Sequence, residues 1–254
     1  MANELLHIYY GPPQSDWIDG IQTRLSESEC STLRARYKEQ WQSCWGELAP
    51  ALSTKIEVLS IVAHRFKETV KRLEEQVASL GEKELNRCID EKLATRLPCD
   101  KDLPFKRSDF AFEVVADIDS FYYEFRSTYE IFVSFVKQFS SKILGRDVTR
   151  EELTQVLKER GADIQWIDEL RKARAEFFHN TAPWIALEIV SRSPPRCELA
   201  IFRRHADRLS TPEVYIPWRK LVEIYSGFQR SQELLISWIF EQISEFEQRG
   251  HADW

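Results

Sequence analysis

Arg174 and His179, separated by four residues, form the pattern in this sequence best suited to chemistry. Histidine is the side chain whose ordinary pKa lets it take or give a proton near neutral pH. Arginine stays charged, and its planar guanidinium grips phosphate oxygens. RNA carries its own nucleophile, the 2′-hydroxyl. These two side chain types therefore suit RNA cleavage that needs no metal ion.

The residues around the pair indicate a helix that ends near the histidine. Ile167, Leu170 and Phe177 recur at helical spacing. On an uninterrupted helix, side chains five positions apart diverge by about 140° and would not share a site. A break over residues 180–183, before or at Pro183, would let the histidine turn back toward the arginine. We expect residues 183–190 to begin a new, apolar helix.

The run Arg174-Ala-Glu-Phe-Phe-His179 resembles the motif of the HEPN superfamily, in which four to six residues separate an arginine from a histidine. HEPN domains are small and all-helical, and many are metal-independent endoribonucleases. The resemblance covers roughly residues 108–250, with a long aromatic-rich helix expected before the motif and an apolar helix after it. Many members have a polar residue directly after the arginine. Here that residue is Ala175, and the polar residue is Asn180, after the histidine.

The resemblance implies a catalytic set of Arg174 as phosphate clamp, His179 as acid or base, and Asn180 as assistant. It also implies a homodimer, because HEPN sites usually form where two protomers meet. The expected substrate is RNA, and the expected setting is toxin–antitoxin or anti-phage defence, with an antitoxin as a protein partner. No cofactor and no metal are implied.

The same residues also fit a structural role. A histidine at the end of a helix is stabilised by the negative end of the helix dipole. Arg174 is then paired with a carboxylate, and Glu124, Asp117 and Glu188 are the candidates. The protein would in that case be a non-catalytic interaction module with a HEPN-like helical fold.

Residues 108–144 predict the long helix that precedes the motif, with an apolar stripe from Val114 to Ile143. Asp117 and Glu124 follow one line beside this stripe. They are either the solvated boundary of the helix or acids that orient Arg174 or His179. A di-metal carboxylate site is disfavoured, since the chain contains no Glu-x-x-His pair.

The formal net charge is −6, which disfavours broad, nonspecific binding to nucleic acid. One arginine-rich stretch is nevertheless suited to RNA phosphates. Its candidate RNA-contacting residues are Arg196, Arg203, Arg204 and Arg208. The alternative is that these arginines are solvated or paired with acids. The five cysteines have no Cys-x-x-Cys spacing, so they predict neither a disulfide framework nor a zinc site.

Long charged amphipathic runs and only 8 glycines predict an all-α protein. We expect an N-terminal helical region over residues 1–100 and a HEPN-like helical bundle over 101–254, joined by a proline-containing linker at 97–104. A minor strand pair is expected where residues 197–202 meet residues 5–10. The sequence shows no signal peptide and no membrane span, which favours a cytoplasmic location. Further helices are expected at 16–25, about 30–48, 53–96, 149–160 and 217–248, with Pro50 separating the second from the third.

Local signals mark the buried faces and the ends of several of these helices. The expected apolar stripe of the 53–96 helix consists of Leu59, Val62, Phe66, Val70, Leu73, Val77 and Leu80. Gly145 is expected to end the helix over 108–144, and Thr149 and Glu152 have the spacing of a capping box. Asp163 is expected to cap the helix of the motif, and residues 191–195 are expected to break the helix that follows it.

Overall fold

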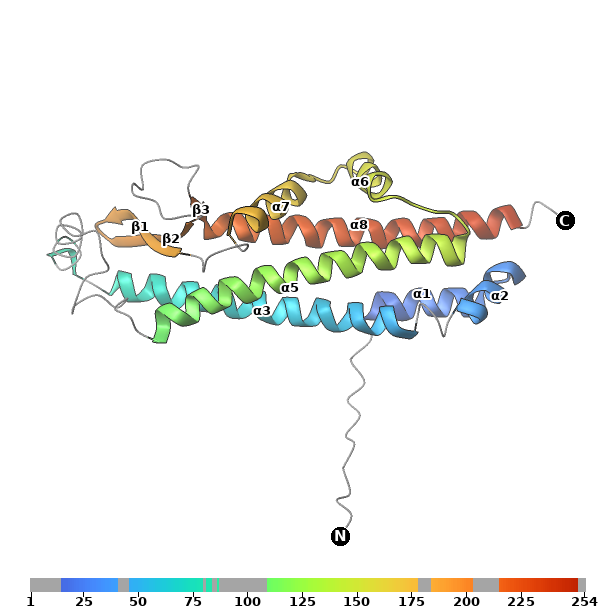
Figure 1. Cartoon of the computed structure of the whole chain (residues 1–254), viewed down its shortest axis with the longest axis horizontal. Helices are drawn as coiled ribbons and strands as arrows, with labels where there is room; N and C mark the ends of the chain where they lie inside the picture. Colours follow the sequence, from blue (N-terminus) through green and yellow to red (C-terminus); the bar gives the residue numbers. More distant parts are fainter. Residues whose placement is uncertain are drawn as a thin grey trace, which may run out of the picture. The chain divides into compact units, whose positions relative to one another are not determined.

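The computed structural model describes residues 15–40, 46–79, 81–83, 86, 109–177, 184–202 and 215–250. These residues form an all-α protein with a small antiparallel sheet, as the sequence predicts (Figure 1). The helices are α1 (Asp16–Glu27), α2 (Ser31–Gln40), α3 (Gly46–Ala78), α5 (Asp109–Phe139), the π-helix η2 (Ser140–Leu144), α6 (Arg150–Glu159), α7 (Gln165–Phe177) and α8 (Trp218–Gly250). The strands are β1 (Trp184–Arg192), β2 (Pro195–Phe202) and β3 (Tyr215–Pro217).

The chain divides into two compact units. Unit 1 comprises Met1–Val58, Thr128–Val156 and Leu234–Trp254, and unit 2 comprises Leu59–Ser127 and Leu157–Glu233. Helices α3, α5 and α8 each contribute residues to both units, so both units draw on the chain before and after residue 100. The expected linker at 97–104 lies outside the described residues, and the division into residues 1–100 and 101–254 stays a prediction.

In unit 1, one face of α1 is fully buried. Trp17 beside that face meets Phe132 and Phe135 of α5 edge-on, with ring centroids 6.2 and 5.5 Å apart, a favoured aromatic geometry. The backbone N–H of Ser15, just before α1, donates to Ser53 Oγ of α3 at 3.1 Å. The buried residues of α1 are Ile18, Ile21 and Leu25.

In unit 2, the apolar stripes read from the sequence are the core. Every stripe residue of α3 from Leu59 to Val77 is buried, and so are Val114, Ile118 and Phe121 on α5. The Phe66 ring of α3 stacks on Phe121 at 5.8 Å. Helical periodicity therefore identified correctly which faces of these two helices are apolar and buried.

The segment between α5 and α6 contains the predicted helix-ending and helix-capping residues. Gly145 caps the end of the helix with φ of 69°, a left-handed conformation that favours glycine. Thr149 and Glu152 form the predicted capping box: the Glu152 N–H donates to Thr149 Oγ1, and the Thr149 N–H donates to Glu152 Oε2 at 2.7 Å.

The helix expected over residues 183–190 is wrong, because residues 184–190 belong to strand β1. Its composition, Trp-Ile-Ala-Leu-Glu-Ile-Val, is rich in aromatic and β-branched residues, which favour strands. The Ser191–Pro195 stretch does not simply end a helix; it holds the turn of a hairpin in which Arg192 faces Pro195. A short apolar run does not by itself distinguish helix from strand, and here the antiparallel partner decides.

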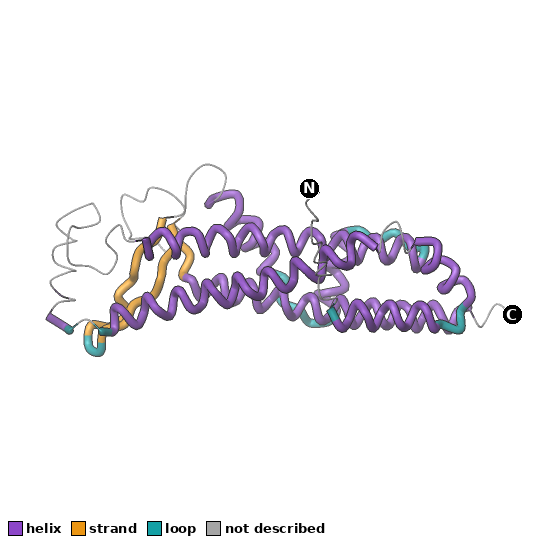
Figure 2. The backbone as a smooth tube through the Cα atoms, turned by 90° about the horizontal axis from the view of Figure 1, so that it is seen from below, coloured by secondary structure: helices purple, strands orange, loops and turns teal. Residues whose placement is uncertain are grey.

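The strand expected near residues 197–202 is confirmed as β2, but its neighbours are β1 and β3. Ala186 faces Ala200 on one side, and Ile216 faces Ile201 on the other (Figure 2). The expected pairing with residues 5–10 therefore does not describe the neighbours of β2, and residues 5–10 lie outside the described part of the chain.

The N-terminal helices differ from expectation in two respects. α2 is described as far as Gln40, residues 41–45 lie outside the described part of the chain, and Leu48, expected on the same helix, belongs to α3. Pro50, expected as a separator, lies inside α3 as its fifth residue. Pro50 is tolerated because it lies close to the start of the helix, where its missing N–H removes at most one helical hydrogen bond.

Candidate functional site

Arg174 lies on α7, three residues before Phe177, the last residue of this helix that the structure describes. The predicted cap of this helix is confirmed, since the Gln165 N–H donates to Asp163 Oδ1 at 2.9 Å. The backbone is helical up to Phe177 and extended from Trp184. His179 and Asn180 lie outside the described residues, and of Arg174 the structure describes the backbone position.

An aromatic cluster holds α7 on α5 and α8 within unit 2. Trp166 stacks on Phe125, with centroids 6.0 Å apart and planes at 16°, and meets Phe228 edge-on at 5.7 Å. Its indole N–H donates to the buried hydroxyl of Ser231 at 3.1 Å. Trp166 is thus buried with its indole N–H hydrogen-bonded, and it anchors α7 on α5 and α8.

Gly227 of α8 makes this close approach possible. A Cβ atom added at Gly227 would lie 2.6 Å from Cδ1 of Trp166, closer than real Cβ contacts allow. Here glycine is required by the approach of two helices, since a mid-helix glycine otherwise weakens a helix relative to alanine.

An ion pair adds a second tie between α7 and α8. Lys220 Nζ lies 2.9 Å from Glu169 Oε1 and 3.0 Å from Glu223 Oε2. Hydrogen bonds to Glu169, and then to Glu223, raise the pKa of the Lys220 ammonium. Ile167 and Leu170 of α7 are buried. The N-terminal part of α7 is therefore anchored by both apolar and charged contacts.

The two candidate supporting acids have different surroundings. Asp117 is buried, and both its oxygens face α3: Oδ1 lies 2.6 Å from Arg65 Nε, and Oδ2 accepts from Thr69 Oγ1 at 2.8 Å. It is therefore not the solvated boundary residue of one expectation, and its described partners belong to α3. Glu124 is half-buried. Support of Arg174 or His179 by either acid stays a prediction.

Of the expected RNA-contacting arginines, the structure describes Arg196, which is exposed on β2. Arg203, Arg204 and Arg208 lie outside the described residues. Another arginine, Arg219 at the start of α8, holds Glu198 of β2 at 3.0 Å between Nε and Oε1. This contact ties the sheet to α8 and was not evident from the sequence.

A buried thiol and a half-buried carboxyl lie near that ion pair. Burial, and then the charge of Glu74, raise the pKa of Cys197 to about 11. Burial also raises the pKa of Glu74, against the opposing effects of the Trp218 indole and Arg219. The Trp218 indole N–H lies near Glu74 but makes no hydrogen bond of standard geometry. Cys197 is therefore a neutral thiol at physiological pH and unsuited to act as a nucleophile.

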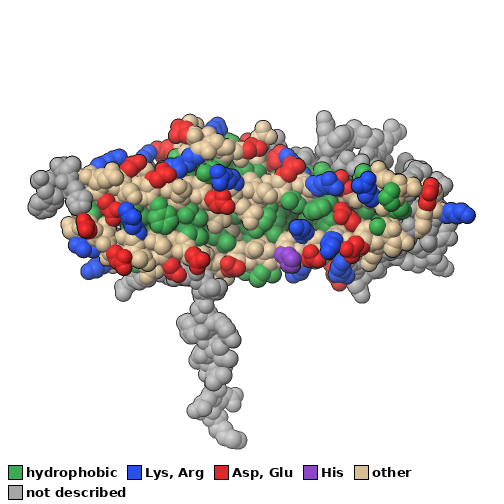
Figure 3. Space-filling view, turned by 180° about the vertical axis from the view of Figure 1, so that it is seen from behind, with side chains coloured by type: hydrophobic (Ala, Val, Ile, Leu, Met, Phe, Trp, Pro, Cys, Tyr) green, Lys and Arg blue, Asp and Glu red, His purple; other side chains and the backbone are tan. Residues whose placement is uncertain are grey.

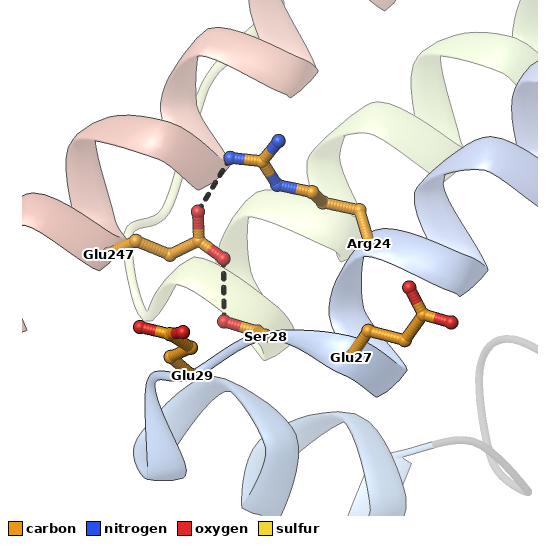
Figure 4. A pocket seen from close by; sticks show the side chains of 5 residues that line it. All are labelled: Arg24, Glu27, Ser28, Glu29 and Glu247. Atoms are coloured by element: carbon orange, nitrogen blue, oxygen red, sulfur yellow. Dashed lines mark hydrogen bonds and ion pairs between the residues drawn. The ribbon is translucent and has the colours of Figure 1, made fainter.

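Unit 1 contains a polar pocket of about 300 Å³ between the end of α1, the connection from α1 to α2 and the end of α8 (Figure 4). Glu247 points toward two partners: Arg24 Nη2 at 2.7 Å and the buried hydroxyl of Ser28 at 2.6 Å. Glu27 and Glu29 complete the lining. Sequence reasoning missed this pocket, because more than two hundred residues separate Ser28 from Glu247.

Within the described ranges, no group of three or more histidine, cysteine or acidic side chains is placed to hold a metal ion. None of the described helices combines the length and the apolar character needed to cross a membrane. No protein-family model, curated protein or solved structure matched the chain in comparisons with known proteins.

Proposed function

We propose that this protein is a metal-independent endoribonuclease of the HEPN type, with Arg174 and His179 in its active site. One observation carries the proposal: Arg174 lies near the end of a firmly seated helix, and the backbone is extended again at Trp184. The interval between these two points holds His179 and Asn180. The change from helix to strand falls between Phe177 and Trp184, and the proposal is that it comes before His179. A histidine beyond the helix end would be free of the divergence that a continuous helix imposes on positions 174 and 179.

In the proposed reaction the 2′-oxygen of RNA attacks the adjacent phosphorus, and the bond from phosphorus to the 5′-oxygen breaks. His179 takes the proton of the 2′-hydroxyl, and the imidazolium is then available to protonate the departing 5′-oxygen. Arg174 neutralises the charge that develops on the phosphate oxygens, and Asn180 donates a hydrogen bond to them. The products are a 2′,3′-cyclic phosphate and a 5′-hydroxyl.

The test is an RNA cleavage assay in excess chelator with structured and unstructured RNAs. We expect wild type to cleave, and Arg174→Ala and His179→Ala to lose about 10²-fold or more of the rate. Arg171→Ala is the matched control: Arg171 lies one turn earlier on α7, is exposed, and pairs with Asp168 at 3.5 Å. This control keeps its activity if the effect belongs to the motif and not to the charge of α7.

Equal loss in Arg171→Ala and Arg174→Ala would contradict a specific role for Arg174. Activity that needs added divalent metal would contradict the metal-independent mechanism. The proposed homodimer is tested separately, by sedimentation equilibrium of the wild-type chain. The proposed setting is a cytoplasmic toxin–antitoxin or anti-phage system, which a growth assay with wild type and His179→Ala would test.

The second candidate function is a non-catalytic helical interaction module. The observation that favours it is strand β1, which replaces the apolar helix expected after the motif and so removes one of the flanks on which the HEPN resemblance rested. Absence of cleavage by wild type on every RNA, together with stable capture of a protein partner, would support this candidate over the nuclease.

A further inference from the structure

Unit 2 carries a surface groove between α3 and α8, with a volume of about 320 Å³. Figure 3 shows hydrophobic side chains at the surface of one face, with charged side chains on either side of them. The groove is lined from α3 by Ser60, Ala63, His64, Phe66 and Lys67, from α5 by Phe121, and from α8 by Trp218, Leu221, Val222, Tyr225, Ser226 and Gln229. None of these residues belongs to the Arg174–His179 motif.

The lining follows helical periodicity on both walls. The α8 residues recur at steps of three and one over three turns, and four of the α3 residues follow the same rule over two turns. The α8 wall is therefore about 16 Å long, at 1.5 Å per residue. A groove of this length between two helical faces matches the apolar stripe of a third helix of about three turns.

The floor of the groove is apolar and buried, and part of its wall is exposed apolar surface. Phe66, Phe121 and Leu221 are buried, and the Phe121 ring contacts Tyr225 edge-on at 6.0 Å. Val222 has a large apolar side chain that is nevertheless 43% exposed. Exposed apolar surface bordered by polar groups is typical of an interaction site.

The rim of the groove carries positive charge without compensation. Lys67 is the formally charged residue of the lining, which includes no aspartate or glutamate. Among the described residues Lys67 has no ion-pair partner, whereas its neighbours on α3 do: Arg65 with Asp117, Lys71 with Glu75, and Arg72 with Glu113. On a chain with a net charge of −6, this unpaired ammonium selects for an acidic occupant.

We propose that the α3–α8 groove binds an amphipathic helix of a partner protein, with leucine-like side chains on one face and acidic residues at the flank of that face. The apolar stripe fills the floor over Phe121 and Leu221, and an acidic side chain pairs with Lys67. This binding does not depend on ribonuclease activity, and it gives the protein a docking surface for a protein partner.

The probe is a fluorescein-labelled helical peptide of about 16 residues, long enough to be partly helical in water. It has leucines at i, i+3, i+4 and i+7, and glutamates beside them. A matched peptide has lysines in place of the glutamates. Fluorescence anisotropy with the full-length chain measures both affinities. We expect micromolar binding of the glutamate peptide and binding of the lysine peptide that is at least about tenfold weaker.

Two substitutions test the groove, and a third is the control. Val222→Lys places a charge at an exposed position of the apolar wall. We expect this substitution to weaken binding of the glutamate peptide about tenfold or more. Lys67→Glu should reverse the preference and favour the lysine peptide. Lys71→Glu makes the same charge change one turn away, outside the lining, and should leave both affinities within about twofold. Circular dichroism and thermal melting check that each variant folds.

Three results would overturn the proposal. The first is equal affinity for the two peptides, and the second is glutamate-peptide binding that survives Val222→Lys. The third is a different occupant. Binding of 2-naphthoate in the groove without peptide binding would indicate a small aromatic anion, and a wild-type dimer that Val222→Lys dissociates would indicate a second copy of this chain.

Discussion

Helix α7 in unit 2 and helix α1 in unit 1 each pack on a different segment of α8. The two junctions contain the same kinds of residues, but the contacts that these residues make differ. Both junctions have a glycine at the close approach, a buried serine hydroxyl and an ion pair. In the α7 junction, Ser231 accepts a hydrogen bond from the buried indole of Trp166. In the α1 junction, Ser28 donates to Glu247, a carboxylate that also serves Arg24 at the surface.

The two junctions differ in whether buried apolar area or an ion pair accompanies the buried serine. The α7 junction buries a whole tryptophan among Phe125 and Phe228, so the apolar area removed from water dominates. The polar part of the α1 junction depends on Arg24, whose side chain is 48% exposed. Ion pairs this exposed contribute little, because water and salt screen them. The polar contact at the α7 junction is therefore the more buried of the two, whereas the apolar faces of both helices are buried.

The largest expected effect is that of Trp166→Ala. The substitution empties the space between α5, α7 and α8 and leaves the Ser231 hydroxyl without its donor. We expect a loss of about 3–5 kcal/mol in the free energy of unfolding, measured by urea denaturation. Phe112→Ala is the control, since Phe112 is an aromatic residue of α5 that is 67% exposed. Similar losses of stability in the two variants would contradict the role assigned to the buried contacts of Trp166.

The two glycines allow the same substitution at both junctions. At Gly227, an added Cβ meets Trp166 at 2.6 Å, whereas at Gly20 it meets Phe240 Cζ at 3.3 Å. We expect Gly227→Ala to destabilise the protein by about 1–3 kcal/mol through overpacking. Gly20→Ala needs only a small shift of Phe240 and gains about 0.5–1 kcal/mol of helix propensity, so its net effect should be near zero or favourable. Thermal melting of both variants measures the two effects. Equal shifts in melting temperature would contradict the proposed difference between the two glycines.

Within the α1 junction, substitutions of Glu247 and of its partner Arg24 should differ in their effect. Glu247→Ala leaves the Ser28 hydroxyl, 4% exposed, without its acceptor, at a cost of about 1–3 kcal/mol. Arg24→Ala removes a half-exposed partner and should cost less than about 1 kcal/mol. The effect of Arg24→Ala should shrink further in high salt, while that of Glu247→Ala persists. Urea denaturation at two salt concentrations measures both, and a larger cost for Arg24→Ala would reverse the interpretation.

The smallest expected effect concerns pH and the sheet of unit 2. Burial raises the pKa of Glu74 above its ordinary value of 4.5, so the folded protein binds this proton more tightly than the unfolded chain. Stability from this group is present below pH 4.5 and is lost as pH rises through the folded-state pKa. Glu74→Gln should therefore match wild type in acid and melt at a higher temperature near pH 7. The opposite pH trend would show that contact with Arg219 outweighs burial.

The sequence predicted the parts of the fold that depend on local periodicity and capping. The stripe of α5, the box formed by Thr149 and Glu152, and the left-handed Gly145 follow from rules that act within a few residues. β1 was missed because its conformation depends on hydrogen bonds to β2, which an apolar run from Trp184 to Val190 does not reveal.

The candidate site could be predicted only as a pattern along the chain. Arg174 was placed correctly on a helix, but no periodicity indicates that Trp166 would be received by a glycine 61 positions later. Asp117 was identified from its line on α5 as either a solvated boundary residue or a supporting acid, whereas its partners Arg65 and Thr69 come from a helix about fifty residues away. The groove on α3 and α8 was invisible for the same reason, since each wall reads as an ordinary amphipathic helix.

Each unit contains a buried, unpaired thiol, Cys30 in unit 1 and Cys197 in unit 2. A buried thiol reacts with an alkylating reagent only when the structure around it opens, so its labelling rate reports a local opening equilibrium. Mass spectrometry of the two labelled peptides would give two opening free energies from one sample. Equal values that fall together in urea would mean that the shared helices α3, α5 and α8 make the chain one cooperative folding unit. Unequal values would mean that one unit opens while the other stays folded.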